Sequence, residues 1–96
     1  MRISALPIEG HRFEVLVGTI DGVPVVVYPG RVHLYQGYNA LQVTSLVRHA
    51  HRLGCRDIIL TCASGAVRDA KPGTFGLITD QMNLTGHNPL STPEGA

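Results

Sequence analysis

The apolar residues in the first third of the chain fall into two short runs that predict a β-hairpin. The first run, Arg12–Ile20, is rich in the β-branched side chains that strands favour, and the second run, Val23–Tyr28, is the expected partner strand. The Asp-Gly pair between them, at residues 21 and 22, is a strong signal for a two-residue hairpin turn. A Pro-Gly pair at residues 29 and 30 is expected to end the second strand.

A helical spacing of apolar residues predicts a helix over Ala40–Leu53. Val43 and Val47 lie four positions apart, the interval that places side chains on one face of a helix. Asn39 is suited to cap the start of this helix, because its side-chain oxygen can accept a hydrogen bond from a free backbone N–H. Gly54 is suited to end the helix, because glycine readily adopts the left-handed conformation found just beyond helix ends.

The second half of the chain contains a short continuous apolar run, Ile58–Leu60, of the kind that buried parallel strands show. A turn of small residues, Cys62–Gly65, follows this run, and Gly76–Met82 predicts a further strand. The second hairpin strand, the helix and Ile58–Leu60 follow one another, which predicts a right-handed strand–helix–strand crossover. We therefore expect an α/β fold: a partial mixed sheet with a β-hairpin, a crossover helix and a buried parallel strand.

The length of 96 residues predicts one small domain, 1–96, with a loose tail at 91–96. A formal net charge of +1 gives no reason to expect nucleic acid or an acidic membrane surface as a partner. We find no apolar run of the kind that a secretory signal or a membrane span needs. We therefore expect a cytoplasmic protein whose two cysteines, Cys55 and Cys62, are free thiols.

The histidines of the second half do not predict a metal site. His49, His51 and His87 lack metal-ligand spacing with Cys or Asp. Because His49 and His51 are two positions apart on a predicted helix, they do not share a face. We expect both on the helix surface, with Arg48 and Arg52 at an edge that faces solvent or another subunit.

Three polar side chains occupy alternate positions directly after the hairpin: Arg31, His33 and Tyr35. Alternate residues of an extended segment share a face, so a guanidinium, an imidazole and a phenol are expected on one side. This set suits an oxyanion beside a hydroxylated ligand. The alternatives are a surface arginine paired with a carboxylate, a histidine that caps a loop and a tyrosine packed at a loop edge.

The small-residue turn after Ile58–Leu60 is a second candidate for contact with an anion. Such a turn can aim backbone N–H groups, here that of Ala63, at an anion, and Ser64 allows a close approach. A tight turn that binds no ligand is the alternative. Ligands of open α/β sheets bind beyond the carboxyl ends of strands. Arg31–Tyr35 and this turn are both expected there, so the two could converge on one site.

Four motifs in the same order resemble those of a known family. Residues 30–38 read G-R-x-H-x-Y-x-G-Y, and Gly10 and His11 precede the hairpin. Residues 60–65 read L-T-C-A-S-G, and residues 80–90 fit D-x-x-N-L-x-G-x-N-P-L. Together these motifs resemble the trimeric purine nucleoside phosphorylases and the related methylthioadenosine phosphorylases, from about residue 10 to residue 90.

The resemblance implies a pentosyltransferase that uses phosphate to split a purine nucleoside into the free base and ribose 1-phosphate. It places His11, Arg31, His33 and the N–H of Ala63 at the phosphate, and Tyr35 at the ribose. It implies no metal and no cofactor, with inorganic phosphate as co-substrate. It also implies a homo-oligomer, which is a trimer in the family.

The sequence departs from the family pattern at two positions and in length. Gln36 stands where the family usually has a Glu that would pair with Arg31. Cys62 stands where the family usually has Asn or Thr. Gln36, Cys62 and Ser64 are candidates to support the phosphate site. The family's base-recognising residues have no counterpart here. We therefore expect a central fragment, the phosphate-binding portion of a phosphorylase, which is inactive alone. The alternative is a non-catalytic anion-binding or subunit-interaction remnant.

Overall fold

The computed structural model describes residues 2–7 and 14–91, and it divides the chain into two compact units. The first unit comprises Met1–Arg56 together with Asn88–Ala96, and the second comprises Asp57–His87. All of the described strands lie in the first unit's longer segment. So do all of the described helical elements except η2, at Pro89–Ser91, which lies in the unit's shorter segment. No described helix has the length and apolar composition needed to cross a membrane.

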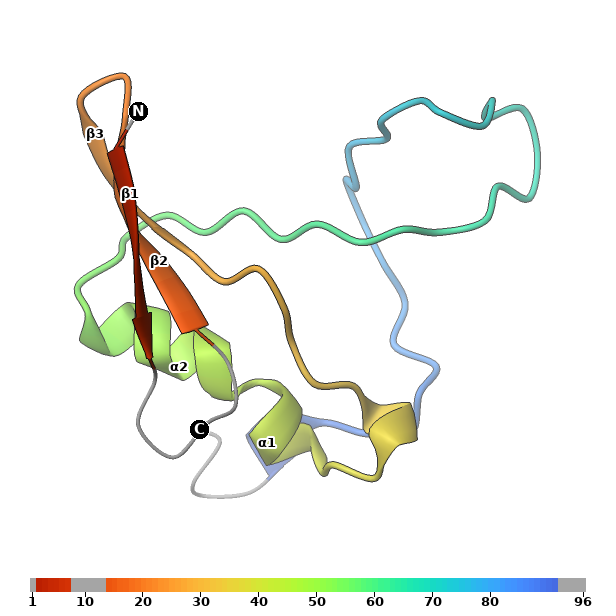
Figure 1. Cartoon of the computed structure of the whole chain (residues 1–96). Coiled ribbons are helices and arrows are strands. Elements are labelled where there is room, and N and C mark those ends of the chain that lie inside the picture. The colour runs from red at the N-terminus through yellow and green to blue at the C-terminus, as the bar shows by residue number, and fades with distance from the viewer. Residues whose placement is uncertain (1, 8–13, 92–96) are drawn as a thin grey trace. The chain divides into compact units, whose positions relative to one another are not determined.

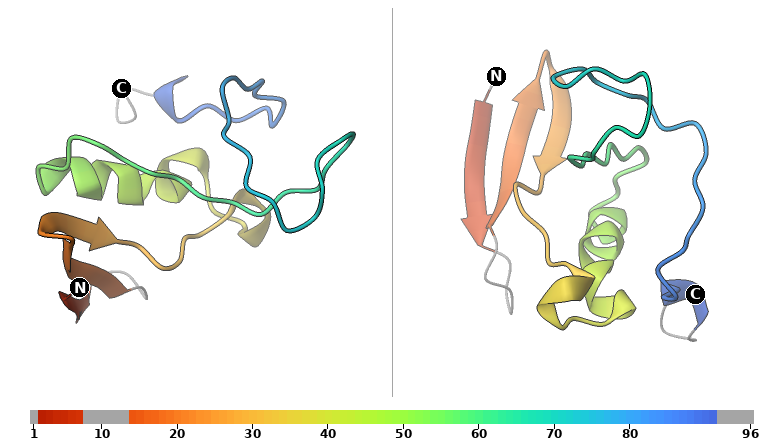
Figure 2. Two further views of the ribbon diagram at one scale, coloured as in Figure 1. Left: turned by 90° about the horizontal axis from the view of Figure 1, so that it is seen from above. Right: turned by 90° about the vertical axis from the view of Figure 1, so that its right-hand side faces the viewer.

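The first unit contains an antiparallel sheet of three strands in the order β1-β2-β3 (Figure 1). The strands are β1 (Arg2–Pro7), β2 (Glu14–Ile20) and β3 (Val23–Val27). Figure 2 shows them side by side, with β2 in the middle. The strand β1 was not expected from the sequence, and its whole length pairs with β2.

The predicted hairpin between β2 and β3 is confirmed. Asp21 and Gly22 both have positive φ, 49° and 79°, as a two-residue type I′ turn requires. The turn brings Ile20 opposite Val23, and Pro24 lies opposite Thr19. A proline is tolerated there because β3 is an edge strand of the described sheet, so a missing N–H on its outer side breaks no ladder bond.

The predicted helix over Ala40–Leu53 forms as two helices, and the expectation of one continuous helix is wrong at Thr44. Its pieces are α1 (Ala40–Val43) and α2 (Ser45–Arg52). The Thr44 hydroxyl donates back to the carbonyl of Ala40 at 2.9 Å, a side-chain bond that competes with helix continuation. Arg48 strengthens the break, since it donates to the Thr44 hydroxyl at 2.8 Å and to the Leu41 carbonyl.

Both predicted helix ends are confirmed. The Asn39 side chain accepts from the backbone N–H of Gln42 at 2.8 Å, and the Gln42 side chain accepts from the N–H of Asn39 at 3.0 Å. At the other end Gly54 has a φ of 87°. Its N–H donates to the carbonyl of His51 at 2.9 Å, while the N–H of Cys55 donates to that of Ala50 at 3.1 Å, the two bonds of a Schellman motif.

Replacing the cap residue, Asn39→Ala, is expected to lower the free energy of unfolding by about 1 kcal/mol, because the N–H of Gln42 loses its acceptor. Asn39→Ser keeps a side-chain oxygen at the same place and is the matched control. Urea unfolding followed by far-ultraviolet circular dichroism measures the difference. Equal stability of the two variants would show that the cap bond contributes nothing.

The buried side chains of the described first unit come from the sheet and from the second helix. Val15 of β2 and Ala50 of α2 are 5% and 6% exposed. No other described residue is buried to this extent. With so little buried apolar surface, the hydrophobic contribution to stability is small.

The second unit, Asp57–His87, contains no helix and no strand. The strands expected at Ile58–Leu60 and Gly76–Met82 are therefore not formed, and all pairs in the described sheet are antiparallel, so the parallel crossover is not formed either. A strand is stable only when a neighbour completes its hydrogen bonds. No segment of this unit does so, and Ile59 remains 88% exposed.

Pro72 and Gly73 form the middle of a turn in this unit. The N–H of Thr74 donates to the carbonyl of Lys71 at 3.3 Å, and Gly73 has a φ of 84°. A proline at the second position and a glycine with positive φ at the third are the requirements of a type II turn. As in the hairpin, the residue types of the turn match the backbone dihedrals that the turn requires.

Candidate functional site

The segment that carries Arg31, His33 and Tyr35 leads from β3 to a 3₁₀ turn, η1 (Leu34–Gln36). His33 has extended dihedrals, φ −124° and ψ 155°, so the chain is extended up to this residue. The turn then closes through a bond from the N–H of Gln36 to the carbonyl of His33, at 3.1 Å. The expected alternation along one extended segment is therefore correct as far as His33 and wrong at Tyr35.

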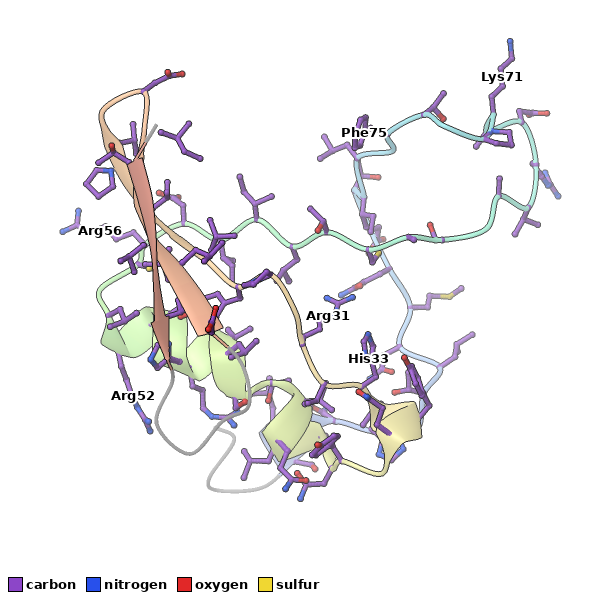
Figure 3. The ribbon with its side chains drawn as sticks, viewed as in Figure 1. Arg31, His33, Arg52, Arg56, Lys71 and Phe75 are labelled. Carbon is purple, nitrogen blue, oxygen red and sulfur yellow. The ribbon has the colours of Figure 1, made fainter. Side chains whose placement is uncertain are left out.

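The turn nevertheless brings His33 and Tyr35 together. Their rings stack with centroids 4.9 Å apart and planes inclined by 20°. Tyr35 is 83% exposed, so most of its ring is open to a ligand. Arg31 is also exposed, and Figure 3 shows it two residues before His33 on the segment that leads into η1. The three side chains are thus displayed on one short segment.

Gln36 contacts His33. The Gln36 side-chain oxygen accepts from the backbone N–H of His33 at 2.8 Å and lies 3.2 Å from Nδ1 of the same residue. The resemblance placed at this position a residue type that would pair with Arg31. In the structure its oxygen is engaged by His33, and the capping function fixes the start of η1.

A second contact anchors the same segment at its other end. Tyr28, directly after β3, has its hydroxyl 2.6 Å from Nδ1 of His49 on α2, with the two rings edge to face. Burial raises the pKa of the Tyr28 phenol, and the nearby Cys55 raises it further. The phenol therefore stays protonated and keeps its hydrogen-bonding role at neutral pH. This bond ties the exit of β3 to α2.

The expectation that His49 is a surface residue of the helix is therefore wrong, because the residue is partly buried. The sequence contained a signal for its position: His49 is three residues after Leu46 and four before Leu53, which places it on the apolar face. Arg48, expected at an edge that faces solvent or another subunit, is partly buried and is bound to Thr44. His51 and Arg52 are exposed, as expected.

The residues expected to supply the second half of the phosphate site lie in the second unit. Cys62, Ala63 and Ser64 are exposed, and the expected turn at Cys62–Gly65 is not formed, since the nearest bend is at 67–69. A tight turn after a strand depends on the strand, and that strand is not formed. The convergence of Ala63 with Arg31 stays a prediction, and His11 lies outside the described residues.

The motif at residues 80–90 is a set of local side-chain turns. Asn83 accepts from the N–H of Thr85 at 3.1 Å and donates to the carbonyl of His87 at 2.8 Å. Gly86 has a φ of 76°, which a glycine adopts without strain. Asn88 accepts from the N–H of Leu90 at 2.9 Å at the start of η2. These polar residues therefore determine the path of the loop.

Both cysteines, Cys55 and Cys62, are free thiols, as expected from the sequence. Among the described residues no group of three or more His, Cys, Asp or Glu side chains is arranged to hold a metal ion.

The charge pattern around the Arg31 segment favours anions. Residues 22–56 contain four arginines and no Asp or Glu, so Arg31 and His33 belong to a cationic stretch that favours anions.

Comparison with known proteins agrees with the resemblance seen in the motifs. The family model described as "Phosphorylase superfamily" matches residues 3–96. Purine nucleoside phosphorylase 1 of Bacillus subtilis is 40% identical over 90 residues, which cover 93% of this chain and 33% of that protein. The purine nucleoside phosphorylases of Mycobacterium leprae and Mus musculus are 42% and 36% identical over 82 and 90 residues, or 84% and 90% of this chain and 31% of each relative.

The chain thus spans about a third of the length of the curated relatives it matches. No solved structure matches it.

Proposed function

Because the chain belongs to the phosphorylase superfamily, we propose that it is the phosphate-binding portion of a purine nucleoside phosphorylase. The observation that carries the proposal is the display of Arg31, His33 and Tyr35 on one short segment, inside a stretch with four arginines and no acid. The segment is held at both ends, by the Tyr28–His49 bond and by η1.

In the proposed site Arg31, His33, His11 and the N–H of Ala63 hold inorganic phosphate, and Tyr35 packs against the ribose. A phosphate oxygen forms a bond to the anomeric carbon of a purine nucleoside while the bond from that carbon to the base breaks. The products are ribose 1-phosphate and the free purine. The chain's contribution is to hold the nucleophile in line with fixed positive charge, which lowers the barrier through position and electrostatics.

The proposal is tested by titrating the chain with inorganic phosphate in a calorimeter. Arg31→Gln is expected to weaken binding roughly tenfold or more, because a hydrogen bond to a charged group contributes about 1.5–3 kcal/mol. Arg52→Gln removes another exposed arginine of the same unit and is the matched control. If both variants lose affinity equally, the chain attracts phosphate only through diffuse charge, and the assigned site is wrong.

The second candidate function is a non-catalytic module of the same fold that binds anions or another subunit. The observation that favours it is the apolar surface of the second unit, where Ile59, Phe75 and Leu77 are among the exposed side chains. A partner that covers such a surface gains hydrophobic stabilisation. The purine nucleoside, the phosphate and a homo-oligomeric partner are all proposals that rest on family membership.

A further inference from the structure

The orientation of the Gln36 side-chain amide is fixed by the backbone of His33. A backbone N–H can only donate a hydrogen bond, so the amide atom that lies 2.8 Å from it must be the oxygen and not the nitrogen. This matters because the two ends of an amide have the same shape and are distinguished only by their partners. Here the backbone N–H of His33 permits only the orientation in which the Gln36 amide oxygen faces it.

The position of the amide oxygen in turn indicates which nitrogen of the His33 ring carries a hydrogen. The same oxygen lies 3.2 Å from Nδ1, and an oxygen acceptor requires a hydrogen on that nitrogen. In a neutral imidazole only one ring nitrogen carries a hydrogen, so Nε2 has a lone pair and cannot donate. The stack on Tyr35 keeps the ring in this plane, and the contact with the Gln36 oxygen favours the ring orientation that turns Nδ1 toward the amide.

We propose that Gln36 holds His33 in the tautomer with hydrogen on Nδ1, so that Nε2 can contact an anion only when the ring is the imidazolium, and anion binding therefore takes up a proton. This inference rests on the proposed function, since it concerns the same phosphate-binding segment. It adds that binding at this segment is regulated by pH. The structural cause is a neutral amide at position 36, which accepts a hydrogen bond but supplies no negative charge.

The charges around His33 support this coupling. In the described part of the chain its ring contacts Tyr35 and Gln36, and the nearest charged group along the segment is Arg31. Residues 22–56 supply no carboxylate that could stabilise an imidazolium. The bound anion is then the negative charge that favours protonation. Binding is strongest where the ring is charged and weakens as the pH rises and the ring loses its proton.

The first test uses sulfate, which stays a dianion at neutral and mildly acidic pH, whereas inorganic phosphate itself changes charge near neutral pH. Calorimetry on the full chain is expected to show sulfate affinity falling by roughly tenfold per pH unit on the alkaline side, the slope of one linked proton. Titrations in two buffers of different ionisation enthalpy are expected to show uptake of about one proton. His33→Gln is expected to lower this slope by one linked proton, and any pH dependence that remains belongs to other groups of the proposed site, such as His11.

Gln36→Leu tests the role of Gln36 more directly than His33→Gln does, because it removes the hydrogen-bond acceptor and keeps the histidine. Its neutral ring is free to place the hydrogen on Nε2 and donate to the anion without a charge. The pH profile is therefore expected to flatten, with sulfate affinity retained on the alkaline side relative to the unmodified chain. An unchanged steep profile in this variant would overturn the role assigned to Gln36.

The second test observes the tautomer directly, without any anion. Nitrogen-15 spectra of the imidazole, in solution or in the solid state if the chain self-associates, are expected to show hydrogen on Nδ1 and a lone pair on Nε2 in His33. Hydrogen on Nε2 would overturn the proposal. Sulfate binding that depends on Arg31 but not on pH would overturn it and leave the proposed function intact, whereas no sulfate binding at any pH would overturn both.

Discussion

The purified 96-residue chain is expected to show no measurable phosphorolysis of inosine, guanosine or methylthioadenosine. Catalysis requires stabilisation of the transition state at the departing base as well as at the attacking phosphate. The resemblance places the base-recognising groups outside the third of the relatives that this chain matches. Enzymes typically lower activation free energies by about 8–23 kcal/mol, and a held nucleophile alone supplies only part of that. Release of free purine over time measures the rate.

Arg31→Ala is the control that makes this result interpretable. Turnover by the unmodified chain that disappears in Arg31→Ala would prove the expectation of inactivity wrong and identify a complete active site. Turnover that is unchanged in the variant would indicate a contaminating enzyme. Adding the complementary fragments of the Bacillus subtilis relative is expected to produce Arg31-dependent turnover, because these fragments supply the groups at the base and the ribose.

Sequence reasoning was most accurate where the structure depends on neighbouring residues. The Asp21–Gly22 turn, the Asn39 cap and the Gly54 stop each follow from the chemistry of two to four adjacent residues. The break at Thr44 was missed because a helical apolar pattern says nothing about a hydroxyl that bonds back to the helix carbonyls. The strand β1 was missed although Ile3 and Ala5 alternate with the polar residues Arg2 and Ser4.

Most of the other expectations that failed required distant partners. Ile58–Leu60 has the composition of a buried strand, but composition does not supply the neighbouring strands that would pair with it. The candidate site is a mixed case, because one of its two unexpected bonds joins residues only three positions apart. The proximity of His33 and Tyr35 was expected, whereas the Gln36–His33 bond and the Tyr28–His49 bond were not. Both depend on where the backbone turns, which alternation alone does not specify.

The isolated chain is expected to self-associate at micromolar concentration, because its second unit leaves large apolar side chains exposed. In the second unit the large apolar side chains of Ile59, Val67, Phe75, Leu77 and Met82 are each at least 83% exposed, and Figure 3 shows Phe75 on its extended loop. No strand of that unit pairs the backbone beside them. Exposed apolar segments with unpaired backbone groups associate with other chains, because association both buries the side chains and completes the hydrogen bonds.

Sedimentation velocity over a concentration series decides this prediction. The double variant Ile59→Lys with Leu77→Lys is expected to shift the chain toward monomer, since charged side chains oppose burial in an interface. Val23→Lys, at an exposed site on the edge strand β3 of the first unit, is the matched control and should have a smaller effect. Complementary fragments of a full-length relative should compete with self-association, because they offer the same surface a better partner. A compact monomer with a sharp cooperative melt would instead show that the chain closes its own core, and the interpretation as the phosphate-binding part of a larger fold would lose its main physical support.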